Sequence, residues 1–248
     1  MTMLTGSRNL AVAVTVTLLA GTASMQADEL KLTTLEWPPY SGSMTGNGVS
    51  AEVIRAVLEP LGHTVVIESL PWQRAVMNAR EVPGIAGYFP EYPAEIDGFT
   101  LSSSIGESPL GLIVPAGKDV GDTSPAALSK MKIGVVNGYV NAGPVTEAIT
   151  QGLKAEAVAD DATNVKKVAA GRIDAAEIDR FVFDHLMATS ADLKPLASRV
   201  AFGPVLETKS LHIAFNKGPE GQKWAAIFAD AIKAADVAAL QGKFLKGQ

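Results

Sequence analysis

Two segments roughly 140 residues apart carry side chains that could hold a small molecule. Residues 35–40 read Leu-Glu-Trp-Pro-Pro-Tyr, and residues 170–179 read Ala-Gly-Arg-Ile-Asp-Ala-Ala-Glu-Ile-Asp. The first segment is aromatic and apolar, whereas the second is acidic. Each lies at the end of a predicted strand, which is where open α/β sheets bind small molecules. The pattern predicts a cleft between two α/β units that closes on a ligand.

Strands and helices are predicted to alternate in both units, which is typical of an α/β fold. Two further apolar segments, 110–116 and 205–211, are candidates for strands that cross from one unit to the other. The predicted strands are 30–35, 64–68, 132–136, 155–158, 175–178 and 210–215. The predicted helices are 51–61, 71–80, one from 144, one capped near 160–164 and ending at 170, one from 179, 219–234 and a shorter one to 245.

Composition argues against several classes of function. The chain has 248 residues, 47% of them hydrophobic, no cysteine and a net charge of −5. Without a basic stripe, nucleic acid is not expected as a partner. The histidines, His63, His185 and His212, lack metal-ligand spacing, and the pair Asp160 and Asp161 reads as helix capping. We therefore expect no metal and no cofactor.

The first 27 residues resemble a cleavable signal peptide. Arg8 is the only charged residue before Asp28, an apolar stretch covers 10–20, and small residues follow up to Ala27. The apolar run is shorter than the ~20 residues that span a bilayer. An uncleaved N-terminal anchor is the alternative. We expect export to the periplasm, with cleavage after Ala27.

The order of these features resembles the periplasmic solute-binding proteins of the polar-amino-acid type, which serve ATP-binding-cassette importers. The segments that carry the resemblance are 37–40, 71–74, 133–139 and 171–175. It implies two lobes joined by a hinge of two crossing strands, with lobe 1 formed by 28–114 plus 209–248 and lobe 2 by 115–208. It also implies a monomer that binds a small molecule and docks on a membrane permease.

Three ligand contacts follow from the resemblance. Trp37 matches an aromatic residue that covers the ligand, and Trp72 matches a second one on the opposite wall. Asp179 matches the lobe-2 carboxylate that receives a ligand amino group. Both tryptophans could instead belong to the core, and Asp179 could cap the helix that follows it.

The departures from the family concern the groups that hold a carboxylate. The family arginine, seven residues before a serine, is replaced by Glu95 before Ser102. A Gly-Thr-Thr turn is replaced by residues 138–140, Gly-Tyr-Val, although backbone N–H groups at that helix start could still bind an anion. Unless Arg74 or Arg180 reaches the cleft, the pocket is negative and aromatic. We therefore expect a cationic or aromatic small molecule rather than a standard α-amino acid, with an amino-acid-like ligand as the alternative.

Further candidates come from the segments around these positions. Residues 87–92 offer Tyr88 and Glu91, and Tyr88 could equally belong to the core. The expected ligand-binding residues are Trp37, Tyr40, Trp72, Arg74, Tyr88, Glu91, Glu95, Asn137, Tyr139, Asn141 and Asp179.

Three functions remain open at this point. The first is a binding protein that closes on its ligand and presents that form to an importer or a sensor. The second is a periplasmic enzyme similar to cyclohexadienyl dehydratase, with Glu95 as the general acid. The third is a scaffold that never closes on a ligand. We expect the binding protein and no enzymatic activity.

Overall fold

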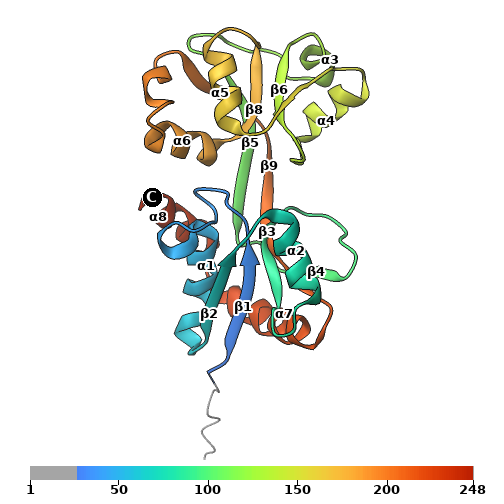
Figure 1. Cartoon of the computed structure of the whole chain (residues 1–248), viewed down its shortest axis with the longest axis vertical. Coiled ribbons are helices and arrows are strands. Elements are labelled where there is room, and N and C mark those ends of the chain that lie inside the picture. Colours follow the sequence, from blue (N-terminus) through green and yellow to red (C-terminus); the bar gives the residue numbers. More distant parts are fainter. Residues whose placement is uncertain (1–26, 248) are drawn as a thin grey trace, which may run out of the picture.

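The computed structural model describes residues 27–247, which form two α/β lobes joined by two long strands (Figure 1). This is the predicted fold class. The predicted signal peptide, residues 1–27, lies outside the described residues except for Ala27. Among the helices of residues 27–247, none combines the length and the apolar character that crossing a membrane requires.

One sheet runs through both lobes in the order β2-β1-β3-β9-β5-β8-β6-β7, and β4 pairs with β9 outside this order. Strands β1, β2 and β3 are parallel in lobe 1, and β6, β7 and β8 are parallel in lobe 2. The strands are β1 (Glu29–Thr34), β2 (Thr64–Ser69), β3 (Gly87–Glu91), β4 (Phe99–Leu101), β5 (Gly106–Pro115), β6 (Ile133–Val136), β7 (Glu156–Val158), β8 (Ala175–Asp179) and β9 (Val200–Asn216).

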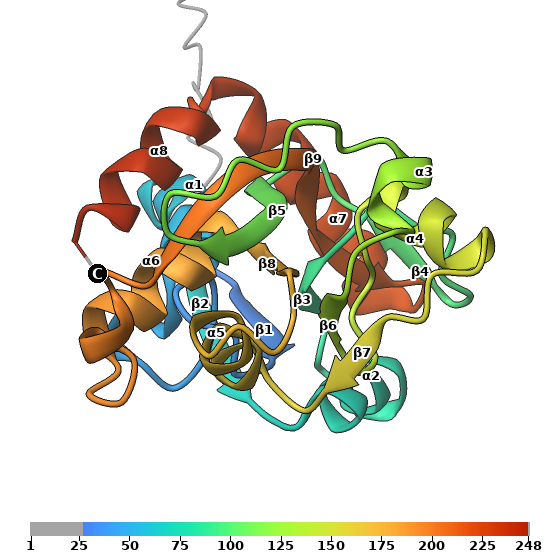
Figure 2. The same cartoon turned by 90° about the horizontal axis from the view of Figure 1, so that it is seen from above.

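Strands β5 and β9 cross between the lobes as an antiparallel pair (Figure 1) and lie side by side near the centre of the molecule seen from above (Figure 2). Their register runs from Gly106 opposite Leu211 to Pro115 opposite Val200, with irregularities around Gly111. Except for Ala116, the predicted crossing segments 110–116 and 205–211 lie inside these two strands. The predicted lobe borders also fall within them.

Helices cover the sheet in each lobe (Figure 1). Lobe 1 contains α1 (Val49–Leu58), α2 (Trp72–Glu81), α7 (Pro219–Ala231) and α8 (Val237–Leu245). Lobe 2 contains α3 (Pro125–Leu128), α4 (Gly143–Thr150), α5 (Asp161–Ala169) and α6 (Arg180–Thr189). Single turns of 3-10 helix lie at Thr45–Asn47, Glu59–Leu61, Lys194–Leu196 and Ile232–Ala234.

The helix predicted over 51–61 ends as an α-helix at Leu58. Pro60 follows two residues later, in the 3-10 turn, and its ring would clash with a carbonyl of a continuing α-helix. The apolar face of α1 is buried as its spacing predicts, through Val53, Ile54 and Leu58. The N–H groups of Val49 and Ser50, at the start of α1, donate to the carbonyls of Pro39 and Tyr40 at 2.9 Å each, and so hold the loop that carries the aromatic segment.

Candidate functional site

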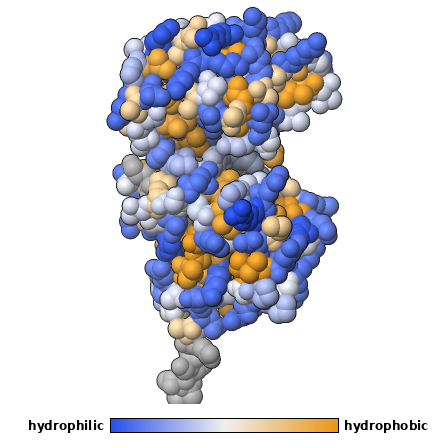
Figure 3. All heavy atoms as spheres, in the orientation of Figure 1, coloured by the Kyte–Doolittle hydropathy of each residue, from blue (hydrophilic) through white to orange (hydrophobic). Residues whose placement is uncertain are grey.

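A pocket of about 510 Å³ lies between the lobes, at the waist that Figure 3 shows between them. It is lined by residues at the C-terminal ends of β1, β3, β6 and β8, and by the first residues of α2 and α5. The C-terminal ends of parallel strands are where side chains from separate segments converge on a ligand. The structure thus brings the aromatic segment 35–40 and the acidic segment 170–179 to one pocket.

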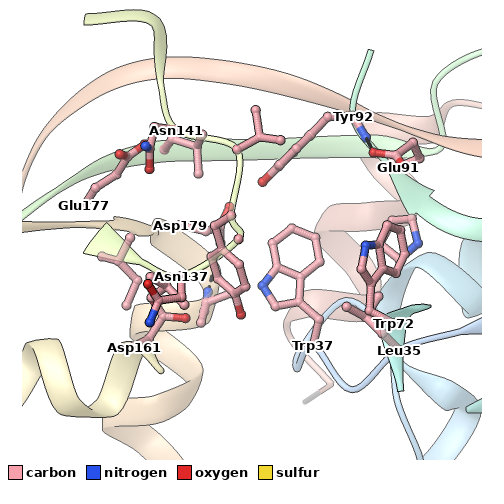
Figure 4. A pocket seen from close by; sticks show the side chains of 18 of the residues that line it. Leu35, Trp37, Trp72, Glu91, Tyr92, Asn137, Asn141, Asp161, Glu177 and Asp179 are labelled. Atoms are coloured by element: carbon pink, nitrogen blue, oxygen red, sulfur yellow. Dashed lines mark hydrogen bonds between the residues drawn. The ribbon is translucent and has the colours of Figure 1, made fainter. Parts of the chain in front are cut away.

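Seven of the predicted residues line this pocket: Trp37, Trp72, Glu91, Asn137, Tyr139, Asn141 and Asp179. The ring of Trp37 is stacked on Tyr40 at 4.5 Å, and Trp72 lies edge-on to Tyr88 at 5.3 Å. Neither tryptophan is buried in the core. Both belong to lobe 1, so Trp72 lies on the same side of the pocket as Trp37 and not on the opposite wall (Figure 4).

The other four predicted residues do not line the pocket. Tyr40 and Tyr88 are buried behind the lining. The ring of Tyr40 packs against Trp37, and the ring of Tyr88 packs against Trp72. Arg74 is exposed on α2, and Glu95 is exposed in the loop between β3 and β4. The replacement of the family arginine by Glu95 therefore adds no charge to the pocket lining.

Neither arginine that could have supplied positive charge lines the pocket. Arg74 is exposed, and Arg180 is exposed with its Nε 2.8 Å from Oδ2 of Asp184. Lys209 is a nearby cation, but it also lies outside the lining and pairs with Glu207 at 2.9 Å. The part of the lining drawn from residues 27–247 contains no lysine, arginine or histidine.

Asp179 lines the pocket, but donors from within the chain satisfy its carboxylate. Oδ1 accepts hydrogen bonds from the backbone N–H groups of Phe181 and Val182, at 2.7 and 2.9 Å, as the cap of α6. Oδ2 accepts the hydroxyls of Tyr40 and Ser108, at 2.8 and 2.6 Å. Burial raises its pKa, and these four hydrogen bonds oppose the rise. Asp179 thus ties lobe 2 to lobe 1 and to the hinge.

Asp161 is a pocket residue that the sequence analysis missed. We expected it to cap a helix together with Asp160, but only Asp160 does so, by accepting the N–H of Thr163 at 2.7 Å. Asp161 is 8% exposed and lines the pocket. Burial, followed by repulsion from Asp179 and Asp160, raises its pKa to about 7. No hydrogen bond to its carboxylate forms within residues 27–247.

Glu177 is the second pocket residue absent from the expected set, although its spacing from Asp179 could have indicated it. It lies two positions before Asp179 on β8, and side chains two apart in a strand point to the same face. Its Oε1 accepts the N–H of Ala142, while its buried Oε2 has no partner among the described residues. Burial raises its pKa to about 7, although the Ala142 N–H and Lys209 act in the opposite direction.

The start of α4, which we considered as an anion site, is already occupied by carboxylates of the chain itself. Ala142 donates its N–H to Glu177, and Gly143 donates its N–H to Oε2 of Glu207 at 2.7 Å. The next residue, Pro144, has no N–H to offer. An incoming carboxylate would therefore meet two negative side chains at this helix start.

The pocket is acidic and partly aromatic, and its side-chain donors are neutral ones, such as the amides of Asn137 and Asn141. Figure 4 shows Asp161 and Glu177 on one side, Glu91 on the other, and Trp37 between them. Such a site can accept hydrogen bonds from a cation and offer it an aromatic face. Within residues 27–247, no three carboxylate or histidine side chains are grouped as a metal site.

Comparison with known proteins places this chain by structure alone. No protein-family model matches it, and no curated protein does. A histidine kinase sensor domain with similarity to periplasmic binding proteins superposes with a TM-score of 0.67 at 14% identity, over 88% of this chain and 96% of that one. An ancestral arginine-binding protein bound to arginine gives 0.65 at 16% identity, over 90% and 98%.

A third similar structure is an ancestral amino acid-binding protein, a precursor of cyclohexadienyl dehydratase, with a TM-score of 0.62 at 15% identity over 88% and 94% of the two chains. At such low identity these likenesses establish the fold and nothing about the ligand. The protein has the two-lobe fold of periplasmic-binding-protein-like domains.

Proposed function

We propose that this protein binds a small organic cation between its lobes and presents the ligand-bound form to a membrane partner. The observation that carries the proposal is the charge of the pocket lining. Glu91, Asp161, Glu177 and Asp179 line it, and no basic side chain of the described residues does.

The unsatisfied carboxylates supply the driving force for binding. Oε2 of Glu177 is buried without a donor, and the mostly buried Asp161 carboxylate receives no hydrogen bond within the described residues. Burying an ionised carboxylate that is incompletely paired is costly. A bound cation would supply the missing donors, and hydrogen bonds between charged partners contribute about 1.5–3 kcal/mol each. The half-buried ring of Trp37 would add about 0.5–2 kcal/mol by contact with the cation.

A ligand that carries a carboxylate is disfavoured for two reasons. The position of the family arginine is taken by Glu95, which is exposed and outside the pocket. The N–H groups at the start of α4 are bound to Glu177 and Glu207. A free α-amino acid would therefore find acidic partners for its ammonium group but no basic side chain of the described residues for its carboxylate.

For the partner, we propose either the permease of an ATP-binding-cassette importer or a sensor protein, with the chain in the periplasm after removal of residues 1–27. Sensor domains and amino-acid-binding proteins are both among the similar structures, which supports each alternative equally. Pull-down of membrane proteins with and without the ligand would separate a permease from a kinase.

We propose binding without turnover. The general acid that an enzyme would need was expected at Glu95, and that side chain is exposed outside the pocket. Incubation of the protein with its ligand, followed by denaturation and mass spectrometry, should return the ligand unchanged. Recovery of a chemically altered ligand would contradict this.

The proposal is tested by a thermal-shift screen of organic cations and carboxylates at pH 8, followed by calorimetry. A ligand at a hundred times its Kd should stabilise the protein by about 2.7 kcal/mol. We expect hits among the cations only. Tight binding of glutamate or another acidic amino acid would refute the proposal.

A further inference from the structure

A carboxylate from lobe 1 faces the acidic residues of lobe 2 across the pocket. Glu91, at the end of β3, accepts the hydroxyl of Tyr88 on Oε2 at 2.9 Å and the N–H of Tyr92 on Oε1 at 2.8 Å. Each carboxylate oxygen can accept a second hydrogen bond. Glu91 is therefore held in place by lobe 1 and still has room for a donor from a ligand.

The lobe-2 side holds two carboxylates with open positions. Asp161 is 8% exposed and Glu177 is 6% exposed, so both are more than nine-tenths buried. Within the described residues, the Asp161 carboxylate receives no hydrogen bond and Oε2 of Glu177 has no donor. These unsatisfied groups point to donors that the ligand itself brings.

The space between these two acidic ends is mainly apolar. Figure 4 shows Trp37 and Tyr92 between Glu91 and the lobe-2 acids. Leu35 and Val136 also line the pocket. Charged groups suit the two ends of this pocket, and methylene groups suit its middle.

We propose that the ligand is an organic dication without a carboxylate, in which an apolar chain joins two ammonium or guanidinium groups. One cationic group binds Asp161 and Glu177, and the other binds Glu91. This inference rests on the proposed function and specifies the class of its ligand. A monocation would leave one acidic end without a partner, whereas a carboxylate would face acidic side chains at both ends of the pocket.

Three matched ligands test the two parts of the proposal. Cadaverine is lysine without its carboxylate, and n-pentylamine is cadaverine without its second amine. Calorimetry at pH 8 should show that cadaverine binds at least tenfold more tightly than lysine and at least tenfold more tightly than n-pentylamine. Because the best chain length is not known, the diamines from propane to heptane are measured with their matching monoamines and with the amino acids ornithine and lysine.

Substitutions then assign the ends of the pocket. Glu91→Gln should reduce the preference for the diamine over the monoamine to near unity. Glu95→Gln is the matched control in the same lobe, because Glu95 is exposed outside the pocket, and it should leave the preference unchanged. An unaltered preference in Glu91→Gln, with correct folding shown by circular dichroism, would overturn the role of Glu91.

The outcomes separate this inference from the proposed function. Equal affinity for diamines and monoamines would overturn the dication and leave a cation-binding protein. Tighter binding of lysine or ornithine than of the diamines would overturn the exclusion of carboxylates. Failure of every amine to bind would overturn both proposals.

Discussion

Replacing Asp161 with asparagine should stabilise the ligand-free protein and weaken cation binding at the same time. The carboxyl group is buried and its pKa is raised from 3.8 to about 7. At pH 8 it is ionised in the folded protein, and that rise in pKa corresponds to about 4 kcal/mol of lost stability. The amide of Asp161→Asn is neutral, but it is also buried and would inherit no side-chain hydrogen-bond partner from the described residues. We therefore expect a gain of about 2–4 kcal/mol at pH 8.

The pH dependence of stability that Asp161 causes is opposite in sign to that of most carboxylates, whose pKa is lowered by folding. Between pH 3.8 and about 7, the folded protein keeps a proton on Asp161 that the unfolded chain has released. The contribution of this group to the stability of the wild type therefore falls as the pH rises through that window. In the Asp161→Asn variant this fall is absent, so the two proteins should differ most at pH 8 and least at pH 4.

Affinity for a cation should rise with pH, whereas the contribution of Asp161 to stability falls. A cation needs the ionised form of Asp161, and at pH 5.5 a carboxyl group with a pKa of about 7 is only about 3% ionised. Affinity for a simple amine should then fall at least about thirtyfold between pH 8 and pH 5.5, because Glu177, whose pKa is also raised to about 7, loses its charge over the same range. The Asp161→Asn variant should bind weakly at both values.

Urea unfolding and calorimetry at pH 5.5 and pH 8 measure both effects. Asp160→Asn is the matched control, because Asp160 is exposed and asparagine caps a helix as well as aspartate does. We expect its stability to change by no more than about 0.5 kcal/mol. If Asp161→Asn were less stable than the wild type at pH 8 and still bound amines normally, the reasoning would be refuted.

Three other substitutions probe the surroundings of the pocket. Tyr40→Phe removes a buried hydrogen bond to Asp179, so urea unfolding should show a loss of about 1–3 kcal/mol, and an unchanged midpoint would argue against the link between the lobes. Trp37→Leu keeps an apolar lining but loses the aromatic face, and calorimetry should show amine affinity reduced about two- to thirtyfold. Glu207→Ala frees both the N–H of Gly143 and the ammonium group of Lys209, so affinity for lysine relative to cadaverine should rise, and a fixed ratio would show that neither group discriminates between the two ligands.

The sequence predicts the fold well because the fold depends on local patterns. Apolar periodicity locates α1, and β-branched runs locate β2. The positions at strand ends also point to Trp37 and Asp179 as pocket residues, because the carboxyl end of a parallel strand is a general site for ligands.

The charge balance of the pocket was harder to predict because it depends on helix phase and on distant partners. A shift of one position separates Asp160, which caps α5, from Asp161, which enters the pocket. Local sequence cannot distinguish the two. The hydroxyl donors of Asp179 lie 139 and 71 residues away in Tyr40 and Ser108, so its satisfied state was not visible in the segment around it.

The contrast between Asp179 and Asp161 explains how such a pocket can select a cation. Both side chains are more than nine-tenths buried, so burial alone does not distinguish them. Asp179 has four internal donors, whereas Asp161 has none within the described residues. At Asp179 four hydrogen bonds oppose the rise in pKa that burial causes, whereas at Asp161 no internal donor opposes it. A cation that supplies donors to Asp161 therefore gains affinity there. Asp179, the position that resembles the amine-binding residue of amino-acid-binding proteins, instead links the two lobes through Tyr40 and Ser108.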